Sequence, residues 1–334
     1  MQSDVAVSII VKTLNEAANI ERCIEGILSA VDGVSAEVIV ADGGSQDETV
    51  TLAARYPVVV VQLKNFSERS CGIGPQLGFQ HSTGRFILLL DADMVLHSLF
   101  LARALDFLCR NPDYAGVGGR LIERSGTGYE YEAAVWEEYP DDADVSWLDG
   151  GGLYRREAIL KTGYLSNRNL HAYEEKELGL RLLDAGWKLR RMKEPAVDHF
   201  GHTMASNELL RKRWKSGYAD ACGESIRACF GKPYFLRMLL LHKAMIACLI
   251  YQFLLLLTVL MIPFSVTPFA FVILLGVLGV IVQLIRKGSP RKVFLSFAYT
   301  NVFSIGLVRG MLKSQTDPRL PIDSVVLKAA GAVT

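Results

Sequence analysis

The 334-residue sequence predicts an α/β fold: a mostly parallel sheet flanked by helices, followed by a C-terminal α-helical transmembrane region. Two observations support this prediction. Short β-branched or leucine-rich runs alternate with helical patterns in the first 200 residues, and such alternation is typical of a parallel sheet. Farther along, Ala244–Ile285 contains no charged side chain. Because roughly 20 apolar residues span a bilayer, this stretch fits two crossings.

The first strands and helices are expected in regular order. The pattern predicts strands at Val7–Val11, Val38–Ala41, Val58–Gln62 and Phe86–Leu90, and helices at Ala17–Val31, Gln46–Ala54 and Leu99–Asn111. The N-terminus has no basic segment and no small-residue cleavage site, so we expect a strand there and not a signal peptide. Ligands of parallel sheets bind beyond the carboxyl ends of the strands, where chemistry is therefore expected.

The composition favours no highly charged macromolecule as the partner. Lys and Arg number 36 against 35 Asp and Glu, so we expect no nucleic acid partner. The six cysteines are scattered, without a CxxC motif or a spacing that pairs with histidine. They are expected to be reduced cytoplasmic thiols.

Two prolines divide the uncharged stretch into a helical hairpin. Pro263 and Pro268 separate predicted helices at Ala244–Ile262 and Phe269–Ile285. Basic or titratable residues flank both ends, namely Arg237, His242, Lys243, Arg286, Lys287, Arg291 and Lys292. Because such residues stay in the cytoplasm, we expect a multi-pass protein of the cell (inner) membrane with its N-terminal domain cytoplasmic. A hairpin buried in a soluble core is the alternative.

Two further segments are open to two interpretations each. Val293–Val308 is about 16 residues long and contains polar side chains, which is short for a crossing, so an interfacial helix is favoured over a third span. Asn207–Tyr234 interleaves basic and apolar residues. It fits either an anionic leaflet or a solvated helix on the N-terminal domain. The expected division is 1–203 for the α/β domain, 204–243 for interfacial helices, 244–312 for the membrane region and 313–334 for a tail.

The first of three acidic clusters follows the second predicted strand. It reads Asp42-Gly43-Gly44-Ser45. A carboxylate at a strand end, followed by two glycines, lets a base or ribose approach the backbone closely. The same sequence also fits an ordinary strand-to-helix turn with a capping side chain.

The second cluster, Asp91-Ala92-Asp93, follows a strand of five apolar residues. Two carboxylates at the exit of a buried strand repel each other unless a cation lies between them. Mg²⁺ or Mn²⁺, which prefer oxygen ligands, would neutralise both and bridge a diphosphate.

The third cluster opens a predicted helix. Leu178 marks its packed face, and Glu177 is placed to pair with Arg181 one turn later, which leaves Glu174 and Glu175 at the helix start. Carboxylates there either stabilise the helix through its dipole, or one of them takes a proton from an attacking hydroxyl group.

The opening strand and the three clusters together resemble a known family. The order Ser8-Ile9-Ile10-Val11-Lys12-Thr13-Leu14-Asn15-Glu16, Asp42-Gly43-Gly44-Ser45, Asp91-Ala92-Asp93 and Glu174-Glu175 is similar to that of family 2 glycosyltransferases of GT-A fold, over roughly residues 5–220. The resemblance implies a nucleotide-sugar-binding fold. It also implies a nucleotide-sugar donor, with a UDP-sugar favoured, and Mg²⁺ or Mn²⁺.

The resemblance assigns roles to particular residues. Thr13, Glu16 and Asp42 would line the nucleotide pocket, and Arg69 would lie near the nucleotide. Asp91 and Asp93 would bind the metal ion, with Asp93 the more direct ligand.

The resemblance also assigns residues to the transferred sugar, to the catalytic base and to the metal shell. Gly151, within the run 150–152, would form a small-residue floor beneath the transferred sugar, although a glycine-rich turn before a strand fits as well. Glu175 would be the catalytic base, with Glu174 the other candidate. A late histidine, His202 or His199, would complete the metal shell unless it is structural.

The implied function is inverting transfer of a hexose from a nucleotide-diphosphate sugar. The acceptor would be membrane-associated and lipid-linked, or another glycan, in polysaccharide or glycolipid synthesis. Leu210 stands where processive members have glutamine, which argues against polymer extension. Two alternatives are a bare polyprenyl phosphate acceptor, which needs no base, and a non-catalytic nucleotide-sugar-binding membrane protein. A dinucleotide-binding oxidoreductase is disfavoured because no GxGxxG follows the first strand. An oligomer is compatible with the sequence.

Overall fold

A computed structural model describes residues 5–124, 142–201 and 204–329. The described residues form two compact units. The first contains residues 5–124, 142–201 and 315–329, and the second contains residues 204–314. Each unit is built around different physical chemistry, because the first encloses an apolar core and the second exposes apolar helices.

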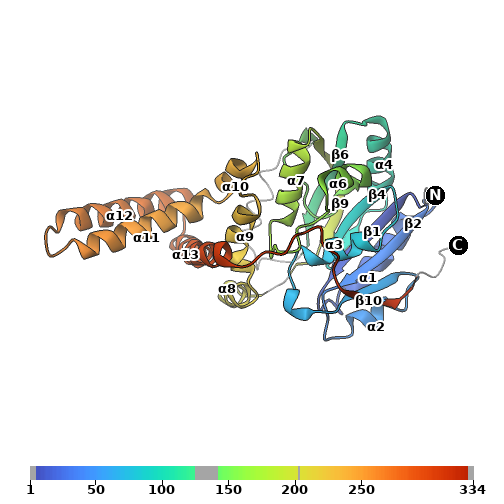
Figure 1. Ribbon diagram of the computed structural model, residues 1–334, viewed down its shortest axis with the longest axis horizontal. Coiled ribbons are helices and arrows are strands. Elements are labelled where there is room, and N and C mark those ends of the chain that lie inside the picture. Colours follow the sequence, from blue (N-terminus) through green and yellow to red (C-terminus); the bar gives the residue numbers. More distant parts are fainter. Residues whose placement is uncertain (1–4, 125–141, 202–203, 330–334) are drawn as a thin grey trace. The chain divides into compact units, whose positions relative to one another are not determined.

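A ten-stranded mixed sheet is the centre of the first unit (Figure 1). Its strands are β1 (Val7–Thr13), β2 (Ala36–Asp42), β3 (Val59–Leu63), β4 (Phe86–Asp91), β5 (Met94–Leu96), β6 (Tyr114–Glu123), β7 (Ala143–Asp144), β8 (Leu153–Arg155), β9 (Lys188–His199) and β10 (Ser324–Lys328). Their order is β10-β3-β2-β1-β4-β8-β6-β9-β5, with β7 paired to β9. Strands β3, β2, β1 and β4 are parallel, and β10 and β8 join them antiparallel on either side.

Helices cover both faces of this sheet. They are α1 (Ile20–Ala30), α2 (Thr49–Ala53), η1 (Phe66–Glu68), α3 (Ile73–Gln80), α4 (Phe100–Arg110), α6 (Arg156–Thr162) and α7 (Glu174–Asp184). Successive residues of β1 belong to opposite faces, so Ile9 lies in one core with Ile24 and Ile10 in the other with Leu77. The mostly parallel α/β fold is therefore confirmed, and the predicted strands and helices match β1 to β4, α1, α2 and α4 within a few residues at each end.

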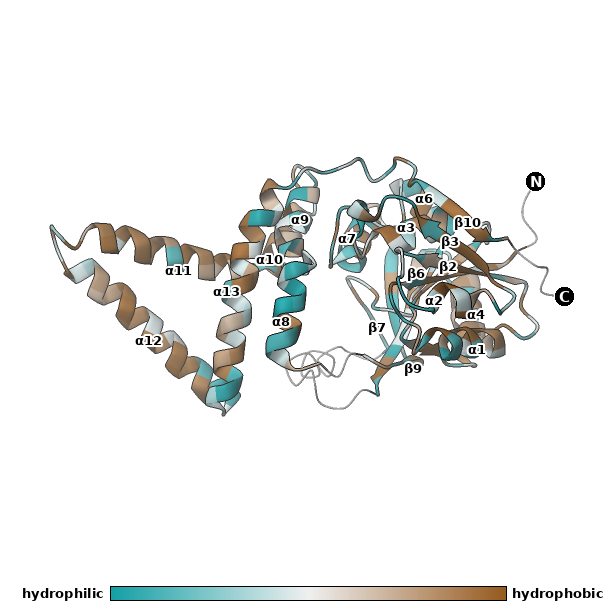
Figure 2. Cartoon of the chain, turned by 90° about the horizontal axis from the view of Figure 1, so that it is seen from below, coloured by the Kyte–Doolittle hydropathy of each residue, from teal (hydrophilic) through white to brown (hydrophobic). Residues whose placement is uncertain are grey.

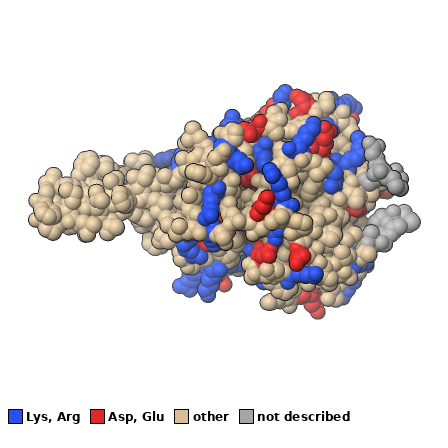
Figure 3. Space-filling view, viewed as in Figure 1, with Lys and Arg blue, Asp and Glu red and all other residues tan. Residues whose placement is uncertain are grey.

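The second unit is entirely helical in its described residues. It contains α8 (Ser206–Lys215), η2 (Tyr218–Asp220), α9 (Ala221–Ala228), α10 (Phe235–Leu241), α11 (Lys243–Leu260), α12 (Thr267–Lys287) and α13 (Pro290–Leu312). Helices α11, α12 and α13 are each long and apolar enough to cross a membrane. Figure 2 shows α11 and α12 as mostly hydrophobic helices, and Figure 3 shows no charged side chains on the visible face of their hairpin. The predicted hairpin is thus present, with only 6% of each span buried.

The third apolar helix is longer than the sequence suggested. It has 23 residues instead of about 16, so the argument that it is too short to cross was wrong. Its polar side chains do not end the helix, because they bond carbonyls one turn back. The hydroxyl of Thr300 donates to the Ser296 carbonyl (2.8 Å) and that of Ser304 to the Thr300 carbonyl (2.6 Å).

Candidate active site

The carboxyl ends of three neighbouring strands bring the opening strand and two acidic clusters together. In the sheet register, Thr13 of β1 lies opposite Asp42 of β2, and Lys12 lies opposite Asp91 of β4. The amide of Gly43 donates to the Thr13 carbonyl (2.9 Å), which continues the pairing beyond the strand. This edge is where parallel sheets bind ligands.

The Asp42 carboxylate holds the turn that follows β2. Its Oδ2 accepts hydrogen bonds from the amides of Gly44 (2.8 Å) and Ser45 (2.9 Å) and from Nε2 of Gln62 (2.8 Å). The side chain is fully buried. The structure therefore shows the turn-forming role left open by the sequence, and contact with a base stays a prediction.

Arg69 lies against this same turn. Its Nε donates to the Gly43 carbonyl (2.7 Å) and its Nη2 to the Gly44 carbonyl, while the guanidinium stacks 4.7 Å from the centre of the Phe66 ring. Gly44 has φ +93°, and a Cβ there would lie 2.4 Å from the Phe66 ring. Only glycine fits this position, so Arg69 and Gly44 together fix the turn.

The loop after β1 is joined to the turn after β2. Asn15 adopts a left-handed conformation (φ 57°), its amide donates to Oγ of Ser45 (2.8 Å), and its Oδ1 accepts from the Gln46 amide (2.8 Å). Asparagine tolerates this conformation better than most residues. Glu16 points to the start of α1, where its carboxylate accepts from Asn19 Nδ2 (2.8 Å).

Thr13, by contrast, is positioned for a ligand. Its hydroxyl is buried and has no hydrogen-bond partner among the described residues. A buried hydroxyl usually finds a partner, so the polar atom is available to a molecule bound at this edge.

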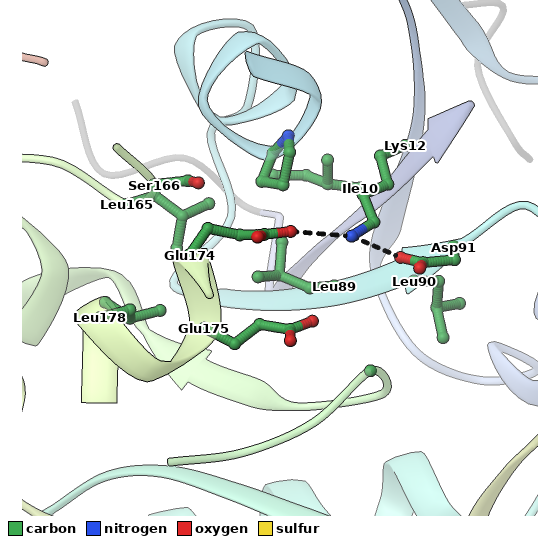
Figure 4. A pocket seen from close by; sticks show the side chains of 12 residues that line it. Ile10, Lys12, Leu89, Leu90, Asp91, Leu165, Ser166, Glu174, Glu175 and Leu178 are labelled. Carbon is green, nitrogen blue, oxygen red and sulfur yellow. Dashed lines mark hydrogen bonds and ion pairs between the residues drawn. The ribbon is translucent and has the colours of Figure 1, made fainter. Parts of the chain in front are cut away.

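Lys12 connects the second and third acidic clusters. Its Nζ lies 3.1 Å from Oδ1 of Asp91 and 3.1 Å from Oε1 of Glu174, as Figure 4 shows. Burial alone would lower the pKa of Lys12, but the two carboxylates raise it well above its usual value. The lysine is therefore a fixed positive charge between the end of β4 and the start of α7.

Glu175 lines the same pocket as Lys12, Asp91 and Glu174. Burial raises the pKa of Glu175 to about 8, and the carboxylates of Glu174 and Asp91 add to the rise, against the lowering effect of Lys12. Glu174 is ion-paired, whereas no described cation pairs with Glu175. Of the two acids, Glu175 is thus the one suited to accept a proton near neutral pH.

The helix that presents these acids is anchored as expected. Glu177 is fully buried, its Oε1 lies 3.1 Å from Nε of Arg181, and it accepts from the Tyr164 hydroxyl (2.9 Å). Tyr173, just before the helix, has φ 68°. The predicted pair of Glu177 and Arg181 is confirmed.

Asp93 faces a histidine from the end of β9. Nε2 of His199 lies 3.3 Å from Oδ2 of Asp93, and Nδ1 of His199 lies 2.6 Å from Oε2 of Glu123. Burial alone would lower the pKa of His199, but Asp93 and Glu123 together raise it to about 9. His202, the other candidate, lies outside the described residues.

The glycine run borders the same pocket. Gly150 lines it together with Asp91 and Glu175. Gly151 has φ +86°, and its amide donates to the Leu89 carbonyl (2.9 Å). A Cβ on Gly151 would lie 2.9 Å from Val197 Cγ1. The run therefore passes close to the end of β4 without side chains, as a floor beneath a ligand requires.

Two residues of this site were passed over by sequence reasoning. Lys12 was given no role, although a lysine in a largely apolar central strand beside Asp91 is itself informative. Glu123 carries no local motif, because its partner His199 is 76 positions away. Glu123 could not have been found from its neighbours in the sequence.

Comparisons with known proteins fit this geometry. The profile of "Glycosyl transferase family 2" matches residues 8–157, and that of "Glycosyl transferase family group 2" matches residues 86–284, more than half of the chain. The chain is a family 2 glycosyltransferase.

The glycosyltransferase resembles curated relatives over part of their length. It is 27% identical over 121 residues to "Dolichol-phosphate mannosyltransferase" of Pyrococcus furiosus, a match covering 35% of this chain and 34% of the relative. It is 35% identical over 148 residues to "Succinoglycan biosynthesis protein ExoO" of Rhizobium meliloti, covering 44% of this chain and 36% of the relative. The chain thus spans about a third of the length of the curated relatives it matches.

A solved structure supports the fold of the glycosyltransferase. The mannosyltransferase PcManGT from Pyrobaculum calidifontis, solved in complex with GDP-Man and Mn²⁺, has a TM-score of 0.55 and 17% identity. The match covers 91% of this chain and 90% of that protein. At this identity the similarity concerns the fold, which is GT-A-like.

Proposed function

We propose that this glycosyltransferase is an inverting, metal-dependent hexosyltransferase that acts on a membrane-associated, lipid-linked saccharide. The observation that carries the proposal is the position of Glu175. It is a half-buried carboxylate whose pKa is raised to about 8, in the pocket that contains Asp91 at the end of β4. A general base needs a pKa near the working pH and a place beside the reacting groups.

The proposed reaction is a single displacement. Glu175 takes the proton of the acceptor hydroxyl as its oxygen bonds to the anomeric carbon. The bond between that carbon and the diphosphate oxygen breaks on the opposite face, so the configuration inverts. Glu174 pairs with Lys12 (3.1 Å), which holds the first turn of α7 and thereby positions Glu175.

The side chains around Asp93 are of the types that bind a divalent cation. Among residues 5–124, 142–201 and 204–329, no group of three potential ligands is assembled. Asp93 nevertheless brings a carboxylate oxygen to 3.3 Å from Nε2 of His199, and Glu123 contacts Nδ1 of the same imidazole (2.6 Å). Carboxylate-oriented histidines are common in metal sites. Asp93 and His199, with Asp91, would hold Mg²⁺ or Mn²⁺, which would offset the charge of the leaving diphosphate.

We propose a UDP-sugar as donor, bound where Thr13, Glu16, Asp42 and Arg69 shape the strand ends. The unpartnered Thr13 hydroxyl supports this location. Asp42 and Arg69 act by fixing the turn over residues 43–45, whose glycines let a base or ribose approach the backbone. GDP-sugars are the comparison in any donor test.

The apolar helices support the acceptor class. We propose that α11 and α12 cross the inner membrane as a hairpin and that basic residues at both ends keep the first unit in the cytoplasm. A site tethered to the bilayer meets acceptors whose lipid tails are buried and whose head groups are in water.

A bare polyprenyl phosphate is the second candidate acceptor. The similarity to the Pyrococcus dolichol-phosphate mannosyltransferase favours it. A phosphate is already ionised, so this reaction would need no general base.

Two substitutions test the proposal in purified full-length protein. Glu175→Gln removes the base and should lower the transfer rate by about 10²- to 10⁴-fold. Asp93→Ala should abolish metal-dependent transfer. Asp106→Asn, which alters an exposed carboxylate on α4 paired with Arg110, is the control and should leave the rate unchanged.

The outcomes separate the candidates. Full activity of Asp93→Ala would refute the metal assignment. An active Glu175→Gln variant with an inactive Asp93→Ala variant would favour the polyprenyl phosphate acceptor. Donors are screened as UDP-sugars and GDP-sugars with and without Mn²⁺, with membranes as the source of acceptor.

A further inference from the structure

The chain leaves the first unit after β9 and rejoins it at β10. Strand β10 pairs antiparallel with β3, with Ser324 opposite Leu63 and Val326 opposite Val61. Both β9 and β10 therefore belong to one sheet. The strands of one folded sheet lie on one side of a bilayer, so residues 204–314 must begin and end on that side. The number of complete crossings between them is even.

The return of the chain is secured by more than strand pairing. The side chain of Gln80 bonds the backbone of Ile322 in both directions, accepting from its amide (2.9 Å) and donating to its carbonyl (3.1 Å). The Ile322 side chain is 2% exposed. The guanidinium of Arg168 donates to the carbonyls of Leu320 (3.2 Å) and Pro321 (3.1 Å).

Among the residues that the structure describes, three helices are long enough to cross, but three is an odd number. Their mean hydropathies are 2.1 for α11, 2.6 for α12 and 1.2 for α13. We propose that α13 does not cross, and that it lies in the membrane surface with one face in contact with lipid. This inference rests on the membrane placement of α11 and α12 proposed above.

The exposed face of α13 is an apolar stripe. Its members are Phe294, Phe297, Ile305, Val308 and Leu312, all exposed. They are separated by 3, 8, 3 and 4 positions, so they share one side of the helix. Exposing five large apolar side chains along one side of a helix to water is unfavourable, whereas contact with the hydrocarbon boundary of a bilayer would bury them.

The opposite face of α13 is packed against η2 and α9. Gly306 and Gly310 are buried there, and a Cβ would lie 2.1 Å from the Ala219 carbonyl oxygen at the first and 2.0 Å from that of Asp220 at the second. The backbones are therefore in direct contact. Such contact fixes which side of α13 faces outward.

Ion pairs hold the C-terminal end of α13 in the same orientation. Asp220 is fully buried, and its Oδ2 lies 3.1 Å from Nη2 of Arg309 and 2.9 Å from Nζ of Lys313. Nζ of Lys313 also lies 2.7 Å from Oε1 of Glu224. Breaking these pairs to carry Arg309 and Lys313 across a bilayer would leave buried carboxylates without their partners.

The direction of α13 within the second unit agrees with a surface position. Figure 1 shows α11 and α12 along their length and α13 almost end-on, and Figure 2 shows α13 running crosswise to the hairpin. The hydroxyl of Ser304 donates to the Met245 carbonyl (3.0 Å), which fastens α13 near the start of α11.

The charges at the ends of α13 favour the same position. Arg291 and Lys292 lie at its first turn, and Arg309 and Lys313 lie at its end. A crossing would place one of these pairs outside the cell, against the usual distribution. A helix in the cytoplasmic surface instead keeps both ends on the cytoplasmic side, where Arg291 and Lys292 can meet anionic head groups and Arg309 and Lys313 keep their carboxylate partners.

Cysteine labelling tests the position directly. Single cysteines replace Ser265 in the hairpin turn, Ser289 before α13 and Ser314 after it, in full-length protein with Cys109→Ser to remove an exposed native thiol. Sealed vesicles of both orientations are treated with a membrane-impermeant maleimide. The parent protein without an added cysteine gives the background.

We expect Ser265→Cys to react only in right-side-out vesicles, and Ser289→Cys and Ser314→Cys only in inside-out vesicles. Reaction of Ser289→Cys and Ser314→Cys from opposite sides would overturn the surface position of α13. Reaction of Ser265→Cys only in inside-out vesicles would show that the hairpin does not cross, so the proposed membrane placement would fail first and this inference with it.

Depth measurements test the lipid contact. Nitroxides on Phe297→Cys, Ile305→Cys and Leu312→Cys should report similar, shallow depths. Leu274→Cys, exposed in the middle of α12, is the deep control. A depth that rises toward the middle of α13 and falls at its ends, or nitroxides that report water, would overturn the inference.

Discussion

At the scale of single residues, one lysine sets the charge balance of the site. Lys12 is shared at equal distances of 3.1 Å by Asp91 and Glu174, and burial raises the pKa of Asp91 against the lowering effect of this lysine. Glu175 lies beside them without a cation of its own among the described residues, and burial dominates its pKa. Neighbouring acids with different environments take different roles, as is common where proton transfer occurs.

The pKa of Glu175 predicts a pH profile. Its pKa is raised to about 8, so the carboxylate form that accepts a proton accumulates as pH rises through that value. We expect kcat/KM to increase from about pH 7 to about pH 9 and then to level off. Glu175→Gln should lack this increase. A wild-type profile that is flat over this range would contradict the role of Glu175 as base.

Lys12→Met is predicted to lower stability. It leaves Asp91 and Glu174 partly buried without their cation, which we expect to lower the free energy of unfolding by about 2 to 3 kcal/mol. Lys64→Met, which removes an exposed lysine, is the control. Thermal denaturation of purified protein measures both. If Mn²⁺ restores the melting temperature of Lys12→Met but not that of Lys12→Met/Asp93→Ala, the Lys12 ammonium and the metal ion both offset the charge of the same carboxylates. An unchanged Tm for Lys12→Met would show that Lys12 does not stabilise the fold.

At the scale of elements, β10 forms the edge of the sheet beside β3. An exposed edge strand carries unpaired backbone groups, which β10 satisfies along β3. The amino group of Lys328 adds a hydrogen bond to the Ala54 carbonyl (2.7 Å) beyond the strand pairing. A segment far along the chain thus stabilises the half of the sheet that carries Asp42.

The docking of this segment can be tested at Ile322. Ile322→Ala removes a buried side chain and should cost about 2 to 5 kcal/mol. Leu320→Ala, two residues earlier, alters a side chain that is 52% exposed and should change stability by less than about 0.5 kcal/mol. Equal melting temperatures for the two variants would show that the C-terminal segment does not stabilise the fold.

At the scale of the whole molecule, the two units differ in where their apolar residues lie. The first has a buried core on both faces of its sheet, whereas the hairpin of the second exposes large apolar residues along its length. The net charge of +1 gives no strong long-range field. The proposed attachment to a bilayer would therefore depend on the apolar helices and on the local basic residues at their ends.

Ligand binding should raise the stability of the whole protein. A ligand at 100 times its Kd adds about 2.7 kcal/mol to the free energy of unfolding. We expect UDP with Mn²⁺ to raise Tm by several degrees and NAD to leave it unchanged, with GDP tested beside them. In Asp93→Ala, the part of this Tm increase that depends on Mn²⁺ should be absent. Stabilisation by NAD alone would contradict a nucleotide-sugar site.

Local patterns allowed much of this fold to be read from the sequence. The four parallel strands, their helices and the hairpin follow from hydrophobic periodicity and from the absence of charge, which act over short stretches of chain. The acids at the strand ends were also found, because the carboxyl ends of parallel strands share one edge.

The remainder depends on contacts between distant residues. Lys12 and Glu174 are 162 positions apart in the sequence, and Glu123 and His199 are 76 positions apart, so no local sequence pattern predicts either contact. The return of the chain at β10, and the division of α13 into an apolar exposed face and a packed glycine face, likewise emerge only when strands pair and helices touch. Periodicity determines which residues an element can bury, and tertiary packing determines which partners they meet.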